Sequence, residues 1–246
     1  MKPFKTDLHI HTCLSPCADL DMSPKGIVAE SLEKGLNIIA VCDHNSAENV
    51  GAVIKAGASE GLYVLPGMEI NSKEEVHTIA IFESEEKAIA MQQILYDNLR
   101  GTNRPDIFGD QVVANELDEV EGFNDRLLIG AVQLSLEKIV RKVHDLGGLS
   151  IASHIDRPSY SIPSQLGFIP PDLDLDAIEI AKPGDKDFES RFLRETRAPI
   201  LTASDAHYRR DIGRRYVSLI LEFPGFGELQ MALKSESGRK IGEIFS

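Results

Sequence analysis

The sequence predicts an α/β barrel, because strand-like and helix-like segments alternate along almost the whole chain. About seven or eight such units are present, which favours a closed barrel over an open sheet. Some of the strand-like runs are apolar on both faces, as in parallel sheets, and polar clusters stand where several runs end. With 246 residues, of which 42% are hydrophobic, the chain is large enough for one such domain.

The elements are expected in a regular order. A first strand covers 4–10, and Ser23-Pro24 begins a helix that ends at Gly35, because proline is favoured at the first helical position and glycine just past the end. Residues 37–42 form a buried strand. The other expected strands are 62–70, 76–82, 149–153, 177–181, 199–203 and 216–222, and the other helices are about 48–58, 85–100, 135–146, 185–197 and 225–235. This order predicts a parallel sheet with right-handed crossovers.

One segment interrupts the alternation. Residues from about 101 to 132 are first turn-rich and then acidic, without a clear period. We interpret them as a short insertion over one end of the barrel, forming a lid or a substrate wall. Residues 159–171 are expected to form a long loop. The whole chain, 1–246, is then a single barrel domain that carries this insertion.

Charge and composition limit the function. A net charge of −13 argues against a long nucleic acid as partner, although metal ions can make a local pocket positive. Three cysteines give no disulfide framework, and the first residues lack the apolar segment of a secretion signal. No apolar run approaches the ~20 residues that cross a bilayer. We therefore expect a cytoplasmic protein without a membrane partner; the oligomeric state is left open.

The histidines carry most of the functional signal. Six of the seven stand beside acids or one another, mostly at the ends of strand-like runs, in these groups: His9-Ile10-His11, Asp43-His44, Glu69 followed by His77, His154, and Asp205-Ala206-His207. His9 and His11 are two apart on a strand, so both rings project from one face. Asp7, just before them, is a candidate to orient one ring. This pattern predicts a multinuclear metal hydrolase.

Two further residues are candidate catalytic groups. Asp43 precedes His44 and is expected either to orient a metal ligand or to handle a proton. Arg157 follows His154 by three residues, and its guanidinium suits a phosphate group beside metal ions. The alternative for Arg157 is a surface side chain paired with a carboxylate. His144, inside an expected helix, is not a candidate ligand.

These motifs together resemble the PHP (polymerase and histidinol phosphatase) family. The resemblance rests on Asp7-Leu8-His9-Ile10-His11-Thr12, Ser15, Asp19, Ser23-Pro24, Val41-Cys42-Asp43-His44-Asn45, Gly67-Met68-Glu69-Ile70, Ser153-His154 and Ser204-Asp205-Ala206-His207. It runs from Asp7 to His207, and therefore over most of the chain. It implies a distorted (β/α)7 barrel that binds up to three divalent metal ions.

The resemblance also implies the ligands of each ion. The first ion would be held by His9, His11, Glu69 and Asp205; the second by Glu69, His77 and His154; the third by Asp19, His44 and His207. The segment between His11 and Asp19 is longer than the usual family spacing, so Asp21 and Cys17 are rival ligands to Asp19. Mixed nitrogen and oxygen ligands accept Zn, Mn or Fe.

The expected activity follows from this site. Three carboxylates and six neutral imidazoles carry about −3 and three divalent ions carry +6, so the site is near +3 and favours an anionic substrate. The resemblance implies a metal-dependent phosphoesterase, in which metal-bound hydroxide attacks a phosphate ester of a small molecule or nucleotide. A nuclease or 3′-phosphatase that acts on short oligonucleotide ends is one alternative. A non-catalytic metal-binding PHP module is another.

Overall fold

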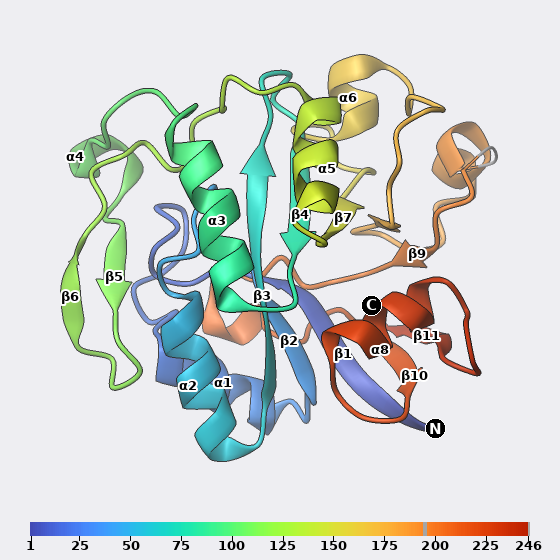
Figure 1. Cartoon of the computed structure of the whole chain (residues 1–246), viewed down its shortest axis with the longest axis horizontal. Coiled ribbons are helices and arrows are strands. Elements are labelled where there is room, and N and C mark those ends of the chain that lie inside the picture. The colour runs from blue at the N-terminus through green and yellow to red at the C-terminus, as the bar shows by residue number, and fades with distance from the viewer. Residues whose placement is uncertain (194–195, 246) are drawn as a thin grey trace.

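The computed structural model describes residues 1–193 and 196–245 (Figure 1). Within these residues nine strands share one sheet, in the order β11-β10-β1-β2-β3-β4-β7-β8-β9. Their bounds are β1 Lys2–Ile10, β2 Ile38–Val41, β3 Tyr63–Asn71, β4 His77–Ile81, β7 Leu149–Ala152, β8 Ala177–Glu179, β9 Ile200–Leu201, β10 Tyr216–Leu221 and β11 Lys240–Phe245. A separate pair consists of β5 (Val112–Ala114) and β6 (Val120–Phe123).

The sheet curls until its two sides nearly meet. The backbone after β9 returns to β1, where the His11 N–H donates to the Ala206 carbonyl at 3.0 Å and the Ala206 N–H donates to the His9 carbonyl at 3.2 Å. Seven strands, β1, β2, β3, β4, β7, β8 and β9, thereby surround one interior. The predicted distorted barrel is confirmed.

The prediction of an all-parallel sheet is wrong for β4. This strand pairs antiparallel with both β3 and β7. The connection between β3 and β4 is residues 72–76, which is too short for a crossover of about a dozen residues or more and forms a hairpin instead. As a result His77, at the start of β4, lies at the same barrel end as the carboxyl ends of the parallel strands.

The strands beyond β1 differ from the expectation in a second way. β10 pairs antiparallel with β1, and β11 pairs antiparallel with β10, so these strands extend the barrel wall outward. The sequence predicted β10 but no strand at β11. Its burial pattern is mostly exposed, which is the pattern of an edge strand with a weak apolar signal.

The helices largely match their predicted positions. They are α1 Pro24–Glu33, α2 Val50–Glu60, α3 Glu85–Tyr96, α4 Pro105–Phe108, α5 Leu136–Asp145, α6 Ile162–Leu166, α7 Lys186–Phe188 and α8 Phe226–Leu233. Ser23 caps α1 through its side chain, as predicted. The loop expected at 159–171 contains α6. The helix expected at 185–197 is α7 followed by a π-helical turn, Glu189–Leu193, and residues 194–195 of that prediction lie outside the described residues.

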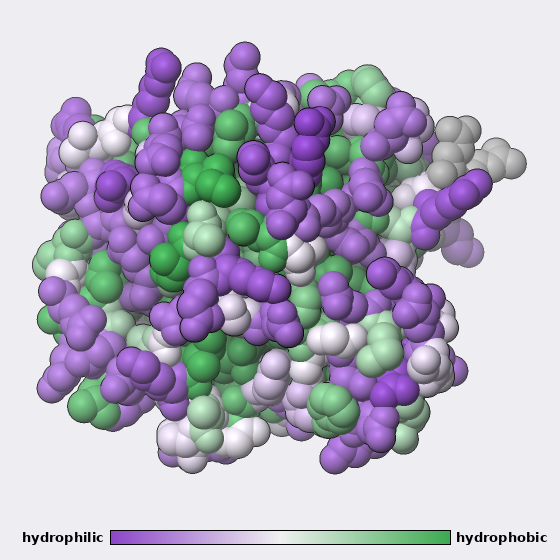
Figure 2. All heavy atoms as spheres, viewed as in Figure 1, coloured by the Kyte–Doolittle hydropathy of each residue, from purple (hydrophilic) through white to green (hydrophobic). Residues whose placement is uncertain are grey.

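Apolar side chains cover both faces of the sheet. Along β2, Ile39 and Val41 belong to a buried cluster shared with α1, α2 and α3. Ile38 and Ala40 belong to a second cluster, shared with α8. This burial on both sides confirms the apolar run at 37–42 as an inner strand. The face of the molecule seen in Figure 2 is mainly hydrophilic, with apolar groups in between.

The insertion is more ordered than its sequence indicated. Its acidic part contains the β5–β6 hairpin, and Asn49 fixes this hairpin by donating to the Val112 carbonyl and accepting from the Ala114 N–H, both at 3.0 Å. Asn45 donates to the carbonyls of Leu128 and Gly130 at 2.7 and 2.8 Å. These bonds hold the end of the insertion against the barrel mouth. No helix in residues 1–193 or 196–245 is both long and apolar enough to cross a membrane.

Candidate metal centre

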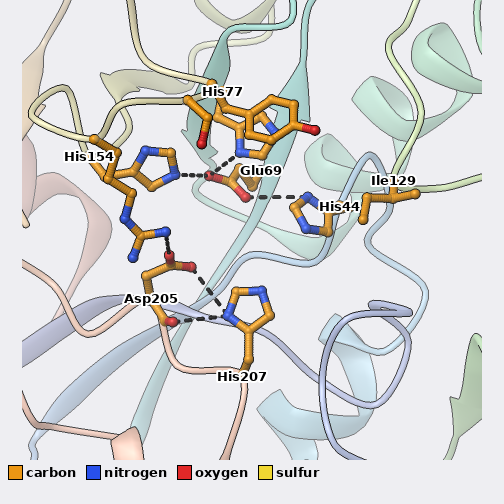
Figure 3. A pocket seen from close by; sticks show the side chains of 10 residues that line it. His44, Glu69, His77, Ile129, His154, Asp205 and His207 are labelled. Atoms are coloured by element: carbon orange, nitrogen blue, oxygen red, sulfur yellow. Dashed lines mark hydrogen bonds and ion pairs between the residues drawn. The ribbon is translucent and has the colours of Figure 1, made fainter. Parts of the chain in front are cut away.

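Eight of the nine predicted metal ligands meet at one end of the barrel. Figure 3 shows those of them that line the cavity, namely His44, Glu69, His77, His154, Asp205 and His207. Seven of the eight are buried and His207 is half-buried. They come from the ends of β1, β2 and β7, from within β3, from the start of β4 and from the segment after β9. The eight are His9, His11, His44, Glu69, His77, His154, Asp205 and His207. The alternation of apolar strands and polar strand ends therefore predicted their convergence correctly.

Glu69 lies at the centre of this cluster. Its Oε1 is 3.1 Å from His77 Nδ1 and 3.1 Å from His154 Nε2. Its Oε2 is 3.3 Å from His44 Nδ1 and 3.6 Å from His11 Nε2. The two carboxylate oxygens thus face different histidines, which is the arrangement that a bridging ligand between two ions needs.

The ligand atoms fall into three overlapping groups. One group is the set predicted for the first ion, His9, His11, Glu69 and Asp205. The other two share His44: one combines it with Glu69 and His77, the other with His11 and His207. The geometry therefore places His44 between the second and third predicted sites. His154 belongs to none of the three groups, but its Nε2 lies 3.1 Å from Glu69 Oε1 and its ring contacts that of His77.

Besides His154, Asp19 is the predicted ligand that lies outside these groups. Its side chain is exposed, and its Oδ1 accepts from the Asp21 N–H at 3.1 Å. Its backbone N–H donates to the His207 carbonyl at 2.9 Å, so the residue stands next to the cluster without contributing to it. Its role as a ligand stays a prediction.

At Glu69, Asp205 and His11 the electrostatics favour the protonation states that bind metals. Burial alone would raise the pKa of Glu69, but His77 and His9 outweigh it and hold that pKa well below its usual value. The pKa of Asp205 is likewise lowered, against the effect of burial, chiefly by His9. Burial, with His207, lowers the pKa of His11 to about 3. Ionised carboxylates and neutral imidazoles are the forms in which these side chains act as ligands. At His9 burial alone would lower the pKa, but Glu179, Asp205 and Glu69 outweigh it and raise that pKa well above its usual value, so a metal ion must displace a proton there.

Neighbouring side chains fix which ring nitrogen of two histidines carries the proton. Ser15 donates its hydroxyl to Asp43 Oδ1 at 2.7 Å, so its oxygen accepts from His11 Nδ1 at 2.9 Å. This leaves the Nε2 lone pair of His11 directed at Asp205, 3.2 Å away. Thr12 adds two hydrogen bonds to Asp43, both 2.7 Å long. Asp43 therefore holds His11 through Ser15, a geometry that favours a positioning role over direct proton handling.

Glu179 orients the ring of His9 in the same way, and it is a residue that was not predicted from the sequence. Its Oε2 is 2.9 Å from His9 Nδ1, which leaves His9 Nε2 facing Glu69 and Asp205 at 3.4 and 3.3 Å. Glu179 is 1% exposed. A lone acid within the otherwise apolar strand run 177–181 was the available signal, because a buried carboxylate requires a partner.

Asp7 was the residue expected to orient a histidine ring, and the structure corrects this. Its oxygens accept from the backbone N–H groups of Ser204 and Gly213, both at 2.9 Å, and weakly from that of His9 at 3.4 Å. Burial raises its pKa to about 6. Asp7 thus fixes the backbone before Asp205 rather than a ring.

We expect Glu179→Gln to lower metal affinity by about 10- to 100-fold, the usual effect of losing a carboxylate that orients a histidine ligand. The amide keeps the size of the side chain but removes the charge that makes His9 Nε2 a good donor. Titration of the metal-free protein with Mn²⁺ or Zn²⁺ measures this. Glu243→Gln, at an exposed position on β11, is the matched control. Unchanged affinity in Glu179→Gln would contradict this role.

Several buried polar atoms of the cluster lack a hydrogen-bond partner among the described residues. They include His77 Nε2, His154 Nδ1 and Asp205 Oδ1. Buried polar atoms are normally paired, so unpaired ones that share one small region indicate a site for a ligand. His154 and Asp205 also have positive φ angles, +27° and +50°, which non-glycine residues tolerate mainly where surrounding bonds hold them. The residues present therefore fit divalent metal ions.

A cavity of about 140 Å³ opens beside the cluster. It is lined by His44, Glu69, His77, Ile129, His154, Arg157, Ser159, Tyr160, Asp205 and His207. Arg157 lies in its wall and forms an ion pair with Asp205 Oδ2. Ile129 is the residue of the 101–132 insertion that lines the cavity. The part of the predicted substrate wall that reaches this cavity is therefore one side chain.

Fold and site together define a class: an α/β barrel whose carboxyl end carries a buried histidine–carboxylate cluster, the architecture that metal-dependent hydrolases use. The model of the PHP domain matches residues 7–123. Over this region, just under half of the chain, the protein is therefore similar to PHP domains.

Relatives are similar over parts of the chain. The Bacillus subtilis protein YqxK is 37% identical over 113 residues, 44% of this chain and 28% of its own length. A 5′-3′ exoribonuclease of Haemophilus influenzae is 31% identical over 77 residues, 31% of this chain and 27% of its own. The matches thus span less than a third of either relative.

The lesion-specific endonuclease Q of Pyrococcus furiosus has a similar fold, with a TM-score of 0.70 at 19% sequence identity. The match covers 98% of this chain but 58% of endonuclease Q. At this identity the likeness concerns the fold.

Proposed function

We propose that the protein is a metal-dependent phosphoesterase that hydrolyses a phosphate ester of a small molecule or a nucleotide. The observation that carries this is the cluster around Glu69, in which ionised carboxylates and imidazoles converge beside a cavity with an arginine in its wall. Up to three divalent ions, Zn, Mn or Fe, would be held by His9, His11, His44, Glu69, His77, His154, Asp205 and His207, with Asp19 as a further candidate. Such ions lower the pKa of a bound water toward ~7 and neutralise charge on a phosphoryl group.

The chain's own residues then have distinct tasks. Glu179 and Asp43 hold His9 and His11 with Nε2 as the donor atom, the latter through Ser15. Arg157 is assigned to the substrate, because a guanidinium binds two phosphoryl oxygens at once and keeps its charge at any working pH. Its ion pair with Asp205 brings this group to the edge of the cluster.

Arg157→Ala should lower kcat/KM by about 10²-fold, with most of the effect on transition-state binding, as for loss of one charged donor to a developing anion. Arg157→Lys should recover part of it, since the charge returns without the two-pronged geometry. Steady-state kinetics on a monoester substrate measures both. Arg100→Ala, at an exposed position outside the cavity lining, is the control. Equal activity of Arg157→Ala and wild type would contradict the assignment.

A nuclease acting on nucleic-acid ends or lesions is the second candidate. It is favoured by the likeness to a 5′-3′ exoribonuclease, which covers 31% of this chain. A cavity of about 140 Å³ accepts a phosphoryl group but not a whole nucleotide, so a terminal phosphate of a longer substrate would also fit. The net charge of −13 favours pieces of two to five nucleotides over long substrates.

One substrate panel tests these proposals. The protein is assayed with Mn²⁺ and with Zn²⁺ on mononucleotides, histidinol phosphate, oligonucleotides of about two to five residues, and a duplex with an abasic site. Turnover of monoesters supports the leading proposal, and turnover confined to the oligomers or the duplex supports the second. Tight metal binding without turnover on any substrate would instead indicate a non-catalytic metal-binding module.

A further inference from the structure

Tyr160 occupies an unusual position at the cavity. Its ring stacks on His77, with ring centroids 4.6 Å apart and an angle of 20° between the planes. It lines the cavity and is nevertheless 42% exposed. Because one face of the ring is packed on the imidazole, the exposed area belongs mainly to the other face and the hydroxyl edge. An aromatic surface is thus available beside the metal cluster.

The ring is held in place by a backbone conformation that is unfavourable for tyrosine. Tyr160 has φ +57°, a region that bulky residues rarely adopt. Its carbonyl accepts from the His77 N–H at 2.8 Å. The next residue, Ser161, donates its hydroxyl to the Arg157 carbonyl at 2.7 Å and caps α6. A strained aromatic residue that its neighbours fix at a cavity is a candidate for function.

The size of the cavity indicates what this ring meets. Ligand pockets usually measure about 300–1,000 Å³, which is roughly two to seven times the 140 Å³ found here. Within the proposed phosphoesterase, the cavity holds the phosphoryl group near Arg157, and the rest of the ester must pass out over the rim. Tyr160 and Ile129 supply apolar surface there. A flat, apolar leaving group would gain contact at this point, while glycerol would not.

We propose that Tyr160 is a specificity-determining residue that stacks on the base of a nucleotide substrate. The proposal rests on the proposed phosphoesterase function and names nucleotides as its substrate class. Base stacking on an aromatic side chain is tolerant of base identity, so the site selects nucleotides over other phosphate esters without selecting one base. The sugar and the phosphoryl group lie between the Tyr160 ring and Arg157.

The test compares Tyr160→Leu, Tyr160→Phe and wild type on two kinds of monoester, adenosine monophosphates (5′ and 3′) and glycerol phosphate, with Mn²⁺ supplied. Leucine should reduce kcat/KM on the nucleotides by about 10-fold or more, within the range that loss of one stacking ring causes. On glycerol phosphate the change should stay below about twofold, and phenylalanine should behave as wild type. Tyr208→Leu, which removes a ring that is also 42% exposed but does not line the cavity, is the matched control.

Binding and metal content separate this proposal from its alternatives. Calorimetry on the metal-loaded protein compares adenosine monophosphate with inorganic phosphate, and Tyr160→Leu should remove the preference for the nucleotide. Equal losses on both esters, together with lost metal, would mean that the ring only supports His77 and would overturn the proposal. If no ester is hydrolysed, the phosphoesterase function fails, and the calorimetry still decides whether Tyr160 binds a base. No nucleotide preference in wild type overturns the inference.

Discussion

Glu69→Gln should abolish both metal binding at the centre of the cluster and turnover, with the fold retained. The Glu69 oxygens lie within 3.6 Å of ring nitrogens of His9, His11, His44, His77 and His154. Glutamine fills the same volume, but it offers one weak oxygen donor and no charge. We expect kcat/KM to fall by about 10³-fold or more, which corresponds to about 4 kcal/mol of transition-state stabilisation.

Kinetics, metal analysis and circular dichroism on the same samples check this result. Glu33→Gln, which removes a carboxylate from the exposed end of α1, should bind metal and turn over substrate as wild type does. A Glu69→Gln protein with near-normal metal content and activity would show that Glu69 is not the bridging ligand. An unfolded variant would be recognised by its spectrum and excluded from the comparison.

The fold was largely predictable because strand and helix patterns are local. The Ser23-Pro24 cap and the apolar run at 37–42 each identify their element without reference to the rest of the chain. The direction of β4 is not local, since an apolar run reads the same in a parallel and an antiparallel pair. The short connection, 72–76, was the one available signal, and it excludes a crossover.

The candidate site was also predictable in its local features and unpredictable in its non-local ones. Donor residues at strand ends were predictable, because parallel strands bring their carboxyl ends together, and the antiparallel β4 adds His77 to the same end. The assignment of ligands to individual ions was not predictable, since His44 belongs to two of the groups. Ring orientation depends on contacts between distant parts of the chain, such as His9 with Glu179, which are 170 residues apart. Only the lone acid in an apolar strand pointed to that contact.

Removing the metal ions should lower the melting temperature markedly as well as stop turnover. The cluster buries the carboxylates of Glu69 and Asp205 and leaves imidazole nitrogens such as His77 Nε2 without hydrogen bonds, arrangements that cost free energy unless a cation compensates them. A ligand that binds only the folded state, at about 1,000 times its Kd, stabilises that state by about 4 kcal/mol. For a chain of this size each kcal/mol shifts the melting temperature by about 2–4 °C, so chelation should lower it by roughly 8–16 °C.

Calorimetric melting with graded Mn²⁺ or Zn²⁺, against a chelated sample, measures this shift. The melting temperature should rise with metal concentration in wild type, and the rise should be small in Glu69→Gln, because that variant lacks the central ligand. This pairing matters, since a metal that bound elsewhere on an acidic surface would stabilise both proteins equally. If chelation changes neither the melting temperature nor the activity, the buried carboxylates and histidines do not hold ions, and the proposed chemistry fails with them.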